Sequence, residues 1–335
     1  RPRIPSTVCW VARPEPLACI FIPESTMRLI LFVVGLVLFL TGPVRARGKL
    51  KVFVLAGQSN MEGAGQIGIN PRSKNEGKGS LEYLVRDPKT AKQFAHTVNK
   101  DGSWRVRDDV WIWYLGRKGG LSVGYGAKSR MIGPEFQIGH VLGDAFKEQV
   151  LLIKTAWGGK TLVKDFRPPS SGGEVGPYYT EMLGHVRDVL ADIGKLFPAY
   201  DGKGYEFSGF FWHQGWNDGL KKPWVEVYEE NLANLVKDLR REWKVPELPV
   251  SIGVSGFGGR GQKVDRRLGI IAAQHAVARR SEFKGRVVSV ETRDFFRPRE
   301  ESPSGQGYHW NGNAETYCLI GEAMAKALLE VVRAK

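Results

Sequence analysis

Five short apolar segments constrain the fold of this chain more than any other feature. They are predicted strands at residues 51–56, 150–156, 207–212, 248–255 and 286–292. Runs of this length between turn residues are typical of strands buried on both faces of a parallel sheet. Longer segments with apolar residues three and four apart predict helices at 134–149, 177–197, 223–243, 264–283 and 313–332. Strands that alternate with helices predict an α/β fold, with a roughly five-stranded parallel sheet and helices on both faces.

One long segment, residues 62–132, interrupts this alternation between the first strand and its helix. It is rich in Gly, Lys and Asp. A structureless loop of that length is unusual. Residues 109–115 alternate like a strand, so the segment is predicted to carry a hairpin of its own. We interpret it as an insertion over the functional site within a single domain, 47–335.

The N-terminal region resembles a secretory signal. Met27 and Arg28 precede the apolar residues 29–40, and small residues follow up to Ala46. This pattern predicts a signal peptide at about 27–46 and a secreted or periplasmic protein. Met27 is then the start, and whether residues 1–26 are translated is left open. An uncleaved signal, which would anchor the chain to a membrane, is the alternative.

Charge and cysteine content limit which binding partners, disulfides and metal sites are expected. The net charge is +14, but it is spread along the chain with no basic block or nucleic-acid-binding motif. Nucleic acid is therefore not an expected partner. Of the three cysteines, Cys9 and Cys19 precede the predicted cleavage point, and Cys318 falls in a helical pattern as a core residue. No disulfide, zinc site or other metal site is expected.

Three segments that follow or precede predicted elements carry residues suited to catalysis. Ser59 follows the first strand, residues 212–219 (Trp-His-Gln-Gly-Trp-Asn-Asp-Gly) follow the third, and His309 precedes the last helix. In open α/β sheets, chemistry occurs beyond the carboxyl ends of the strands. A serine, an amide and a histidine there can serve as nucleophile, oxyanion donor and general base. Each segment also has a structural interpretation, as a helix cap or a turn.

These segments resemble the motifs of SGNH (GDSL-like) hydrolases of the sialate O-acetylesterase and acetylxylan esterase group, similar to carbohydrate esterase family 6. Residues 57–61 (Gly-Gln-Ser-Asn-Met) resemble the opening block, and residues 215–218 resemble the Gly-x-Asn-Asp block. Residues 132–135 and 156–159 also look like internal blocks of the group. The resemblance spans roughly residues 50–330. It implies a three-layer α/β/α flavodoxin-like fold.

The resemblance also implies roles for individual residues. Ser59 would attack the acyl carbonyl, and His309 would take its proton and return it to the leaving alcohol. The oxyanion would be held by the backbone N–H of Ser59, by the backbone N–H of Gly158 or Gly159, and by the side-chain amide of Asn217 or Gln214. Gln58 and three tryptophans beside the blocks are predicted to contact the substrate, namely Trp157, Trp216 and Trp310.

Two positions depart from the pattern of the group. Gln306 stands three residues before His309, where the family usually has an acid. A carboxylate from elsewhere could orient His309, with Asp218, Asp294 and Glu301 as candidates; alternatively, the enzyme would use a Ser–His dyad. Trp216 stands where the group often has Glu, which would change the contact with the sugar.

We therefore predict an exported serine hydrolase that removes O-acetyl groups from sugars or polysaccharides without a cofactor. The alternatives are an SGNH lipase or thioesterase, and a noncatalytic carbohydrate-binding protein that kept the fold. Residues 154–161 lack the first Gly of a P-loop, and residues 256–261, although they match a dinucleotide fingerprint, follow the fourth strand. Neither segment predicts nucleotide binding. The identity of the sugar and the oligomeric state are left open.

Overall fold

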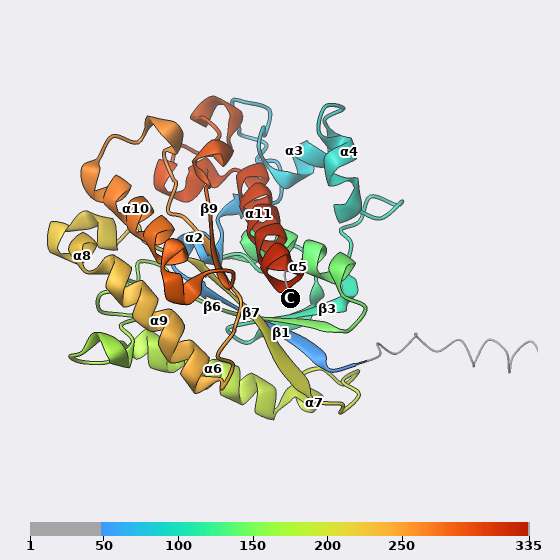
Figure 1. The fold of residues 1–335 in the computed structure, drawn as a ribbon. Coiled ribbons are helices and arrows are strands. Elements are labelled where there is room, and N and C mark those ends of the chain that lie inside the picture. Colours follow the sequence, from blue (N-terminus) through green and yellow to red (C-terminus); the bar gives the residue numbers. More distant parts are fainter. Residues whose placement is uncertain (1–47, 334–335) are drawn as a thin grey trace, which may run out of the picture. The chain divides into compact units, whose positions relative to one another are not determined.

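A seven-stranded sheet runs through the centre of the described part of the chain, residues 48–333 of a computed structural model (Figure 1). Its strand order is β4-β3-β6-β1-β7-β8-β9. The predicted signal peptide and the residues before it lie outside the described residues. Within residues 48–333, no helix has both the length and the apolar character needed to span a membrane.

All five predicted strands are confirmed as neighbouring parallel strands. They are β1 (Leu50–Gly57), β6 (Val150–Ala156), β7 (Tyr205–His213), β8 (Val250–Gly253) and β9 (Val287–Val290). β1 lies between β6 and β7, with Gly57 opposite Ala156 on one side and His213 on the other. The three strands therefore end together, and the loops that follow them meet at one edge.

The prediction of a five-stranded sheet is wrong because the segment 62–132 contributes two more strands. β3 (Arg107–Tyr114) pairs parallel with β6, and β4 (Arg117–Leu121) returns antiparallel beside β3. The predicted strand at 109–115 and its hairpin are thus confirmed, but the hairpin widens the central sheet. The rest of the segment forms a small two-stranded sheet and three short helices: β2 (Gly65–Gln66), β5 (Met131–Ile132), α3 (Leu81–Arg86), α4 (Ala91–Phe94) and η1 (Ala95–Thr97).

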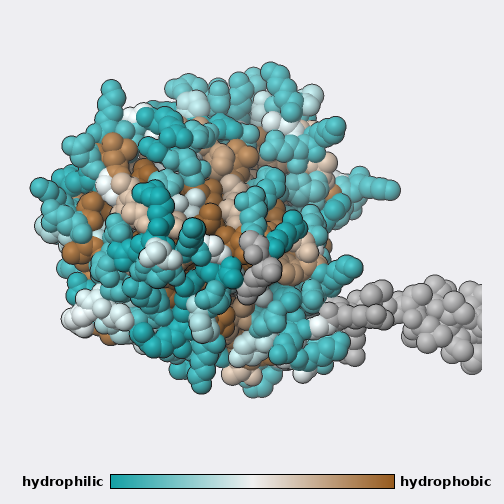
Figure 2. Space-filling view, viewed as in Figure 1, coloured by the Kyte–Doolittle hydropathy of each residue, from teal (hydrophilic) through white to brown (hydrophobic). Residues whose placement is uncertain are grey.

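Helices cover both faces of the sheet, as the alternation of β1 side chains requires. Val52 and Val54 belong to one core, with α6 (Pro177–Ala191), α9 (Tyr228–Glu242) and α10 (Asp265–Arg279). Phe53 and Leu55 belong to the other, with α5 (Pro134–Ala145) and α11 (Ala314–Arg333). The three-layer α/β/α arrangement is confirmed. The face shown in Figure 2 is mostly hydrophilic, with hydrophobic side chains in patches between the polar ones.

The helices keep the predicted positions, but α5 ends at Ala145, the segment 264–283 divides into α10 and η5 (Ser281–Phe283), and two further segments are interrupted. The segment 177–197 divides into α6 and α7 (Ile193–Leu196), and the segment 223–243 divides into α8 (Lys222–Glu226) and α9. The Val227 backbone between α8 and α9 has φ −101° and ψ −1°, which breaks the regular turn. Cys318 is free and buried in α11, as predicted.

A buried ion pair joins the sheet to α5. Lys154 Nζ on β6 lies 2.7 Å from Glu135 Oε2, and both side chains are fully buried. Nζ also donates to the backbone oxygens of Glu62, at 2.6 Å, and Tyr125, at 2.7 Å. All three of its hydrogens are therefore used, and one lysine ties α5, the end of α2 (Ser59–Glu62) and the segment after β4 together.

Replacing Lys154 by Met is expected to destabilise the protein by about 3–5 kcal/mol, since it leaves the Glu135 carboxylate buried without a counter-ion. Equilibrium unfolding in urea measures this loss. The double variant Lys154→Met with Glu135→Gln should lose less stability than the single variant, because no buried charge remains. A single variant as stable as the wild type would contradict the role of this pair.

Candidate active site

The loops after β6, β1 and β7 bring the candidate catalytic residues together. Ser59 begins α2 directly after β1, in the middle of the three strands. A side chain built on Gly158, after β6, would begin 4.0 Å from Ser59 Cβ. One built on Gly159 would begin 4.0 Å from Asn217 Nδ2, which belongs to the loop after β7. Ser59 therefore has the glycine turn on one side and Asn217 on the other.

Gly57 allows this close approach of the strands. Its φ is +153°, and a Cβ there would lie 2.2 Å from the backbone oxygen of His213. No other residue fits this position, since both the backbone conformation and the contact exclude a side chain. The sharp turn that exposes Ser59 at the sheet edge follows from this glycine.

Gln58 holds the loop after β7 in place. Its side chain is only 2% exposed. Oε1 accepts from the backbone N–H groups of Gly215, at 3.0 Å, and Asn217, at 3.4 Å, while Nε2 donates to Asn217 Oδ1 at 2.9 Å. The predicted contact of Gln58 with the substrate stays a prediction, and the bonds of this side chain are to the loop after β7. Its amide orients Asn217.

Four N–H donors at this edge have no acceptor among residues 48–333: the backbone N–H groups of Ser59, Gly158 and Gly159, and Asn217 Nδ2. The fixed position of Asn217 Oδ1 leaves Nδ2 free to donate. Gln214, the alternative amide, is 2% exposed and donates to Lys160 O at 3.0 Å and to Asp218 Oδ2 at 2.5 Å. It therefore orders the loop and has no free N–H for a substrate.

His309 lies on a short 3₁₀ segment, η8 (Gly307–Gly312), which is tied to the helix of Ser59. Asn60 Nδ2 donates to Tyr308 O at 3.0 Å. The Tyr317 hydroxyl on α11 lies 2.9 Å from Asn60 Oδ1 and 3.3 Å from His309 O. Sequence analysis assigned no role to Asn60 or Tyr317, although Asn60 belongs to the opening block. These bonds tie the segment that carries His309 to α2, the helix that begins at Ser59.

The turn after His309 is held in an uncommon backbone conformation. Trp310 and Asn311 have φ values of 52° and 55°, in the left-handed region. Trp310 is fully buried, and Asn311 Nδ2 donates to Arg297 O at 3.0 Å. The indole of Trp310 belongs to the core under α11, and its predicted contact with the substrate stays a prediction.

The family of carbohydrate esterases described as sialic acid-specific acetylesterases matches residues 49–330. The chain belongs to this family. A comparison with curated proteins gives no significant match. Among solved structures, a protein from Arabidopsis thaliana is similar, with 17% identity, a TM-score of 0.54, and coverage of 83% of this chain and 97% of the other. NanS is similar with 12% identity, a TM-score of 0.53, and coverage of 87% and 100%. These two likenesses support the fold.

In this esterase, no carboxylate of the described residues hydrogen-bonds to the His309 imidazole. Asp218 is fully buried and accepts from the backbone N–H groups of Leu162 and Val163. Burial raises its pKa to about 6. Asp294 is ion-paired with Arg260 at 2.8 Å. The third candidate acid, Glu301, is exposed on η7 (Arg299–Glu301). Gln306 is exposed as well.

Burial lowers the pKa of His309, and no neighbouring charge raises it. The side chain is only partly exposed, so water solvates the imidazolium poorly. The imidazole is therefore neutral at neutral pH and ready to accept a proton. This arrangement matches a Ser–His dyad more closely than a triad.

Aromatic side chains form one wall of the site. The rings of Trp216 and Tyr308 lie 5.7 Å apart, and Tyr308 is 45% exposed. The Arg267 guanidinium lies 5.7 Å from the Trp216 ring and has no acidic partner in the described part of the chain. Trp157, in contrast, packs against Tyr178 and His185 toward α6. Trp216 thus remains a candidate for substrate contact. Tyr308 is a second candidate, which the sequence did not indicate.

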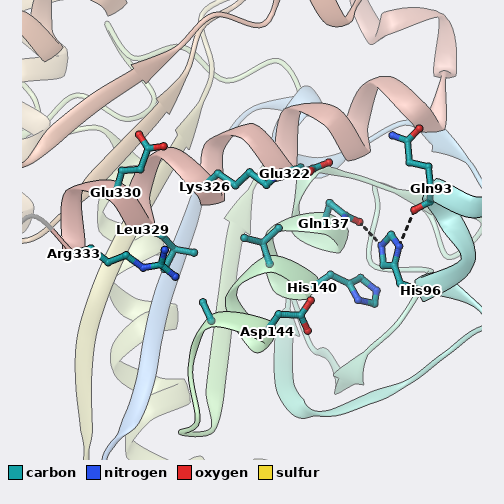
Figure 3. Close-up of a pocket in the computed structure, with 12 residues that line it drawn as sticks. Gln93, His96, Gln137, His140, Asp144, Glu322, Lys326, Leu329, Glu330 and Arg333 are labelled. Carbon is teal, nitrogen blue, oxygen red and sulfur yellow. Dashed lines mark hydrogen bonds and ion pairs between the residues drawn. The ribbon is translucent and has the colours of Figure 1, made fainter.

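A separate groove of about 600 Å³ lies between α4, η1, α5 and α11 (Figure 3). Its α5 residues, such as His140 and Asp144, lie toward the end of that helix away from Gly133 and Glu62. Its α11 residues, Glu322 to Arg333, lie beyond the end that carries Tyr317. Across residues 48–333, no group of three or more His, Cys, Asp or Glu side chains is arranged to hold a metal ion.

Proposed function

We propose that this esterase releases acetate from O-acetylated sugars with Ser59 as nucleophile and His309 as general base. The placement of Ser59 between the Gly158–Gly159 turn and the free amide of Asn217 supports this assignment most strongly. Ser59 Oγ attacks the acetyl carbonyl while His309 takes its proton. His309 then returns that proton to the sugar oxygen as the acetyl–enzyme forms, and water repeats the sequence.

The four unpartnered N–H donors stabilise the negative charge that develops on the carbonyl oxygen. They are held in place before substrate binds, because Gln58 fixes Asn217 and the β1–β6 pairing fixes the glycine turn. Donors that need no reorganisation lower the barrier more than mobile ones. Because burial lowers the pKa of His309, this base is already neutral when the substrate binds.

The experiment that tests this function is acetate release by purified residues 47–335. Acetylated xylan, O-acetyl sialic acid and an aryl acetate are the substrates. Turnover of at least one acetylated sugar is the expected result. No turnover of any of the three, together with measurable sugar binding, would contradict the proposal and favour a noncatalytic binding protein.

We further propose that the sugar is acidic, as in sialic acid. Arg267 supports this, because it has no acidic partner among residues 48–333 and lies beside the aromatic wall of Trp216 and Tyr308. Replacing Arg267 by Ala is expected to raise KM for O-acetyl sialic acid by about 10–100-fold, the value of one charge-assisted contact. The aryl acetate, which has no carboxylate, serves as the control substrate. Equal losses on both substrates would contradict a role in recognising the sugar carboxylate.

We propose export as well, on the signal-like residues 27–46. N-terminal sequencing of the protein recovered outside the cytoplasm tests it. A mature N-terminus near residue 47 is expected, and an intact N-terminus in a membrane fraction would favour the anchor.

A further inference from the structure

Glu62 lies close to the nucleophile but has no place in the mechanism described above. It follows Ser59 by three positions on α2, a spacing that puts both side chains on one side of a helix. The Tyr114 hydroxyl donates to Glu62 Oε1 at 3.0 Å and lies 3.2 Å from Ala156 O at the end of β6. Glu62 Oε2 accepts no hydrogen bond from residues 48–333, and the side chain is only partly buried. One carboxyl oxygen is thus fixed while the other is free.

The free oxygen faces the reaction centre. A side chain built on Gly158 would begin 3.0 Å from Glu62 Oε2 and 4.0 Å from Ser59 Cβ. Both groups therefore lie close to the same point above the exposed glycine turn. No other carboxylate approaches Gly158 this closely within the described residues.

Glu62 and His309 lie on different sides of Ser59. Asn60, two positions before Glu62, points to the segment of His309 through its bond to Tyr308 O. Residues two apart on a helix do not share a face. The strand order agrees, because Tyr114, which holds Glu62, ends β3 beyond β6, whereas Trp216, which contacts Tyr308, follows β7. During acyl transfer, the leaving oxygen must face His309, and the carbonyl oxygen must face the N–H donors. The acyl group takes the remaining direction, away from His309, and Glu62 lies on that side of Ser59.

We propose that the Glu62 carboxyl closes the acyl side of the site and restricts the enzyme to acetyl esters. This inference rests on the Ser59–His309 assignment of the proposed function. The methyl group of an acetyl ester is small, so water can still hydrate Glu62 Oε2. A longer acyl chain displaces that water and sets methylene groups against an anionic oxygen, which is unfavourable without a replacement hydrogen bond. Burial raises the pKa of Glu62, which agrees with a carboxyl that is already short of water.

Aryl acetate, propionate and butyrate test the proposal, since they share one leaving group and differ only in the acyl chain. The measured quantity is the ratio of kcat/KM for butyrate to that for acetate. Glu62→Leu and Glu62→Ala are each expected to raise this ratio by about tenfold or more, the usual value of a methylene in an apolar pocket. Glu62→Gln keeps the size and polarity of the side chain and should raise the ratio much less.

Glu322→Leu is the matched control. It makes the same chemical change on α11, in the groove away from Ser59 (Figure 3), and should leave the ratio at the wild-type value. An unchanged ratio in folded Glu62→Leu and Glu62→Ala would overturn the proposal. Loss of all turnover in a folded Glu62→Gln would overturn it too, by placing Glu62 in the catalytic machinery. Failure of the proposed function itself would show separately, as wild-type protein that does not hydrolyse the acetate.

Discussion

Replacing Ser59 by Ala is expected to reduce kcat/KM for acetate release by at least about 10³-fold, because no other group can form the acyl–enzyme. His309→Ala should cost a similar factor, since without a base the hydroxyl is a weak nucleophile. The double variant should be little worse than either single variant, because the two residues act as a unit. Acetate release from the aryl ester and from the acetylated sugar measures these losses.

The control for these variants is their thermal unfolding. Ser59 and His309 are partly exposed, so neither change should lower the Tm greatly. Wild-type kcat/KM should rise with pH as His309 loses its proton, with the midpoint of the rise below the ordinary histidine pKa, because burial lowers this pKa. Retention of more than a tenth of the activity in folded Ser59→Ala would contradict the assignment.

The second large effect is expected at Asn217. Replacing it by Ala should lower kcat by about 10²–10³-fold, which is the usual cost of one oxyanion donor. KM should change little, since the donor acts on charge that develops only in the transition state. Steady-state kinetics on the aryl acetate separates the two parameters.

Gln58→Ala provides the comparison for Asn217→Ala. It removes the bonds that orient Asn217 but leaves Nδ2 present, so a smaller loss of kcat is expected. A loss in Asn217→Ala of less than about fivefold would indicate that the backbone donors suffice and that Asn217 is no part of the oxyanion site.

The parallel core of the fold could be predicted because its strands are aliphatic and continuous. β1 and β6 are buried along nearly their whole length, so both faces are apolar in the sequence. β3 is also a parallel strand of the central sheet, but its amino-acid composition is different. It begins with charged residues and continues with aromatic ones, and it lies inside the long segment 62–132, with β4, β5 and α5 between it and its neighbour β6. Length and composition therefore indicated a hairpin but not its place in the sheet.

The site could be predicted only as far as strand ends determine it. Ser59, Asn217 and the Gly158–Gly159 turn follow adjacent strands, so topology alone brings them together. The position of a residue along the chain does not determine the direction in which its side chain points. Gln58 lies within a motif and Trp310 lies beside one. The side chains of both point inward, and this direction is determined by the packing around them. Tyr317 meets Asn60 from 257 residues away, a contact that no local pattern indicates.

The conformation of the turn at Trp310 and Asn311 affects the thermal inactivation of the enzyme. Two adjacent non-glycine residues in the left-handed region cost on the order of 1–3 kcal/mol each, so the surrounding contacts must hold the turn. Those contacts are the buried indole of Trp310 and the bond from Asn311 to Arg297 O. A local opening that frees either one releases the strain and lets His309 drift from Ser59 while the sheet stays intact. On heating, the enzyme is therefore expected to lose its activity before its fold unfolds.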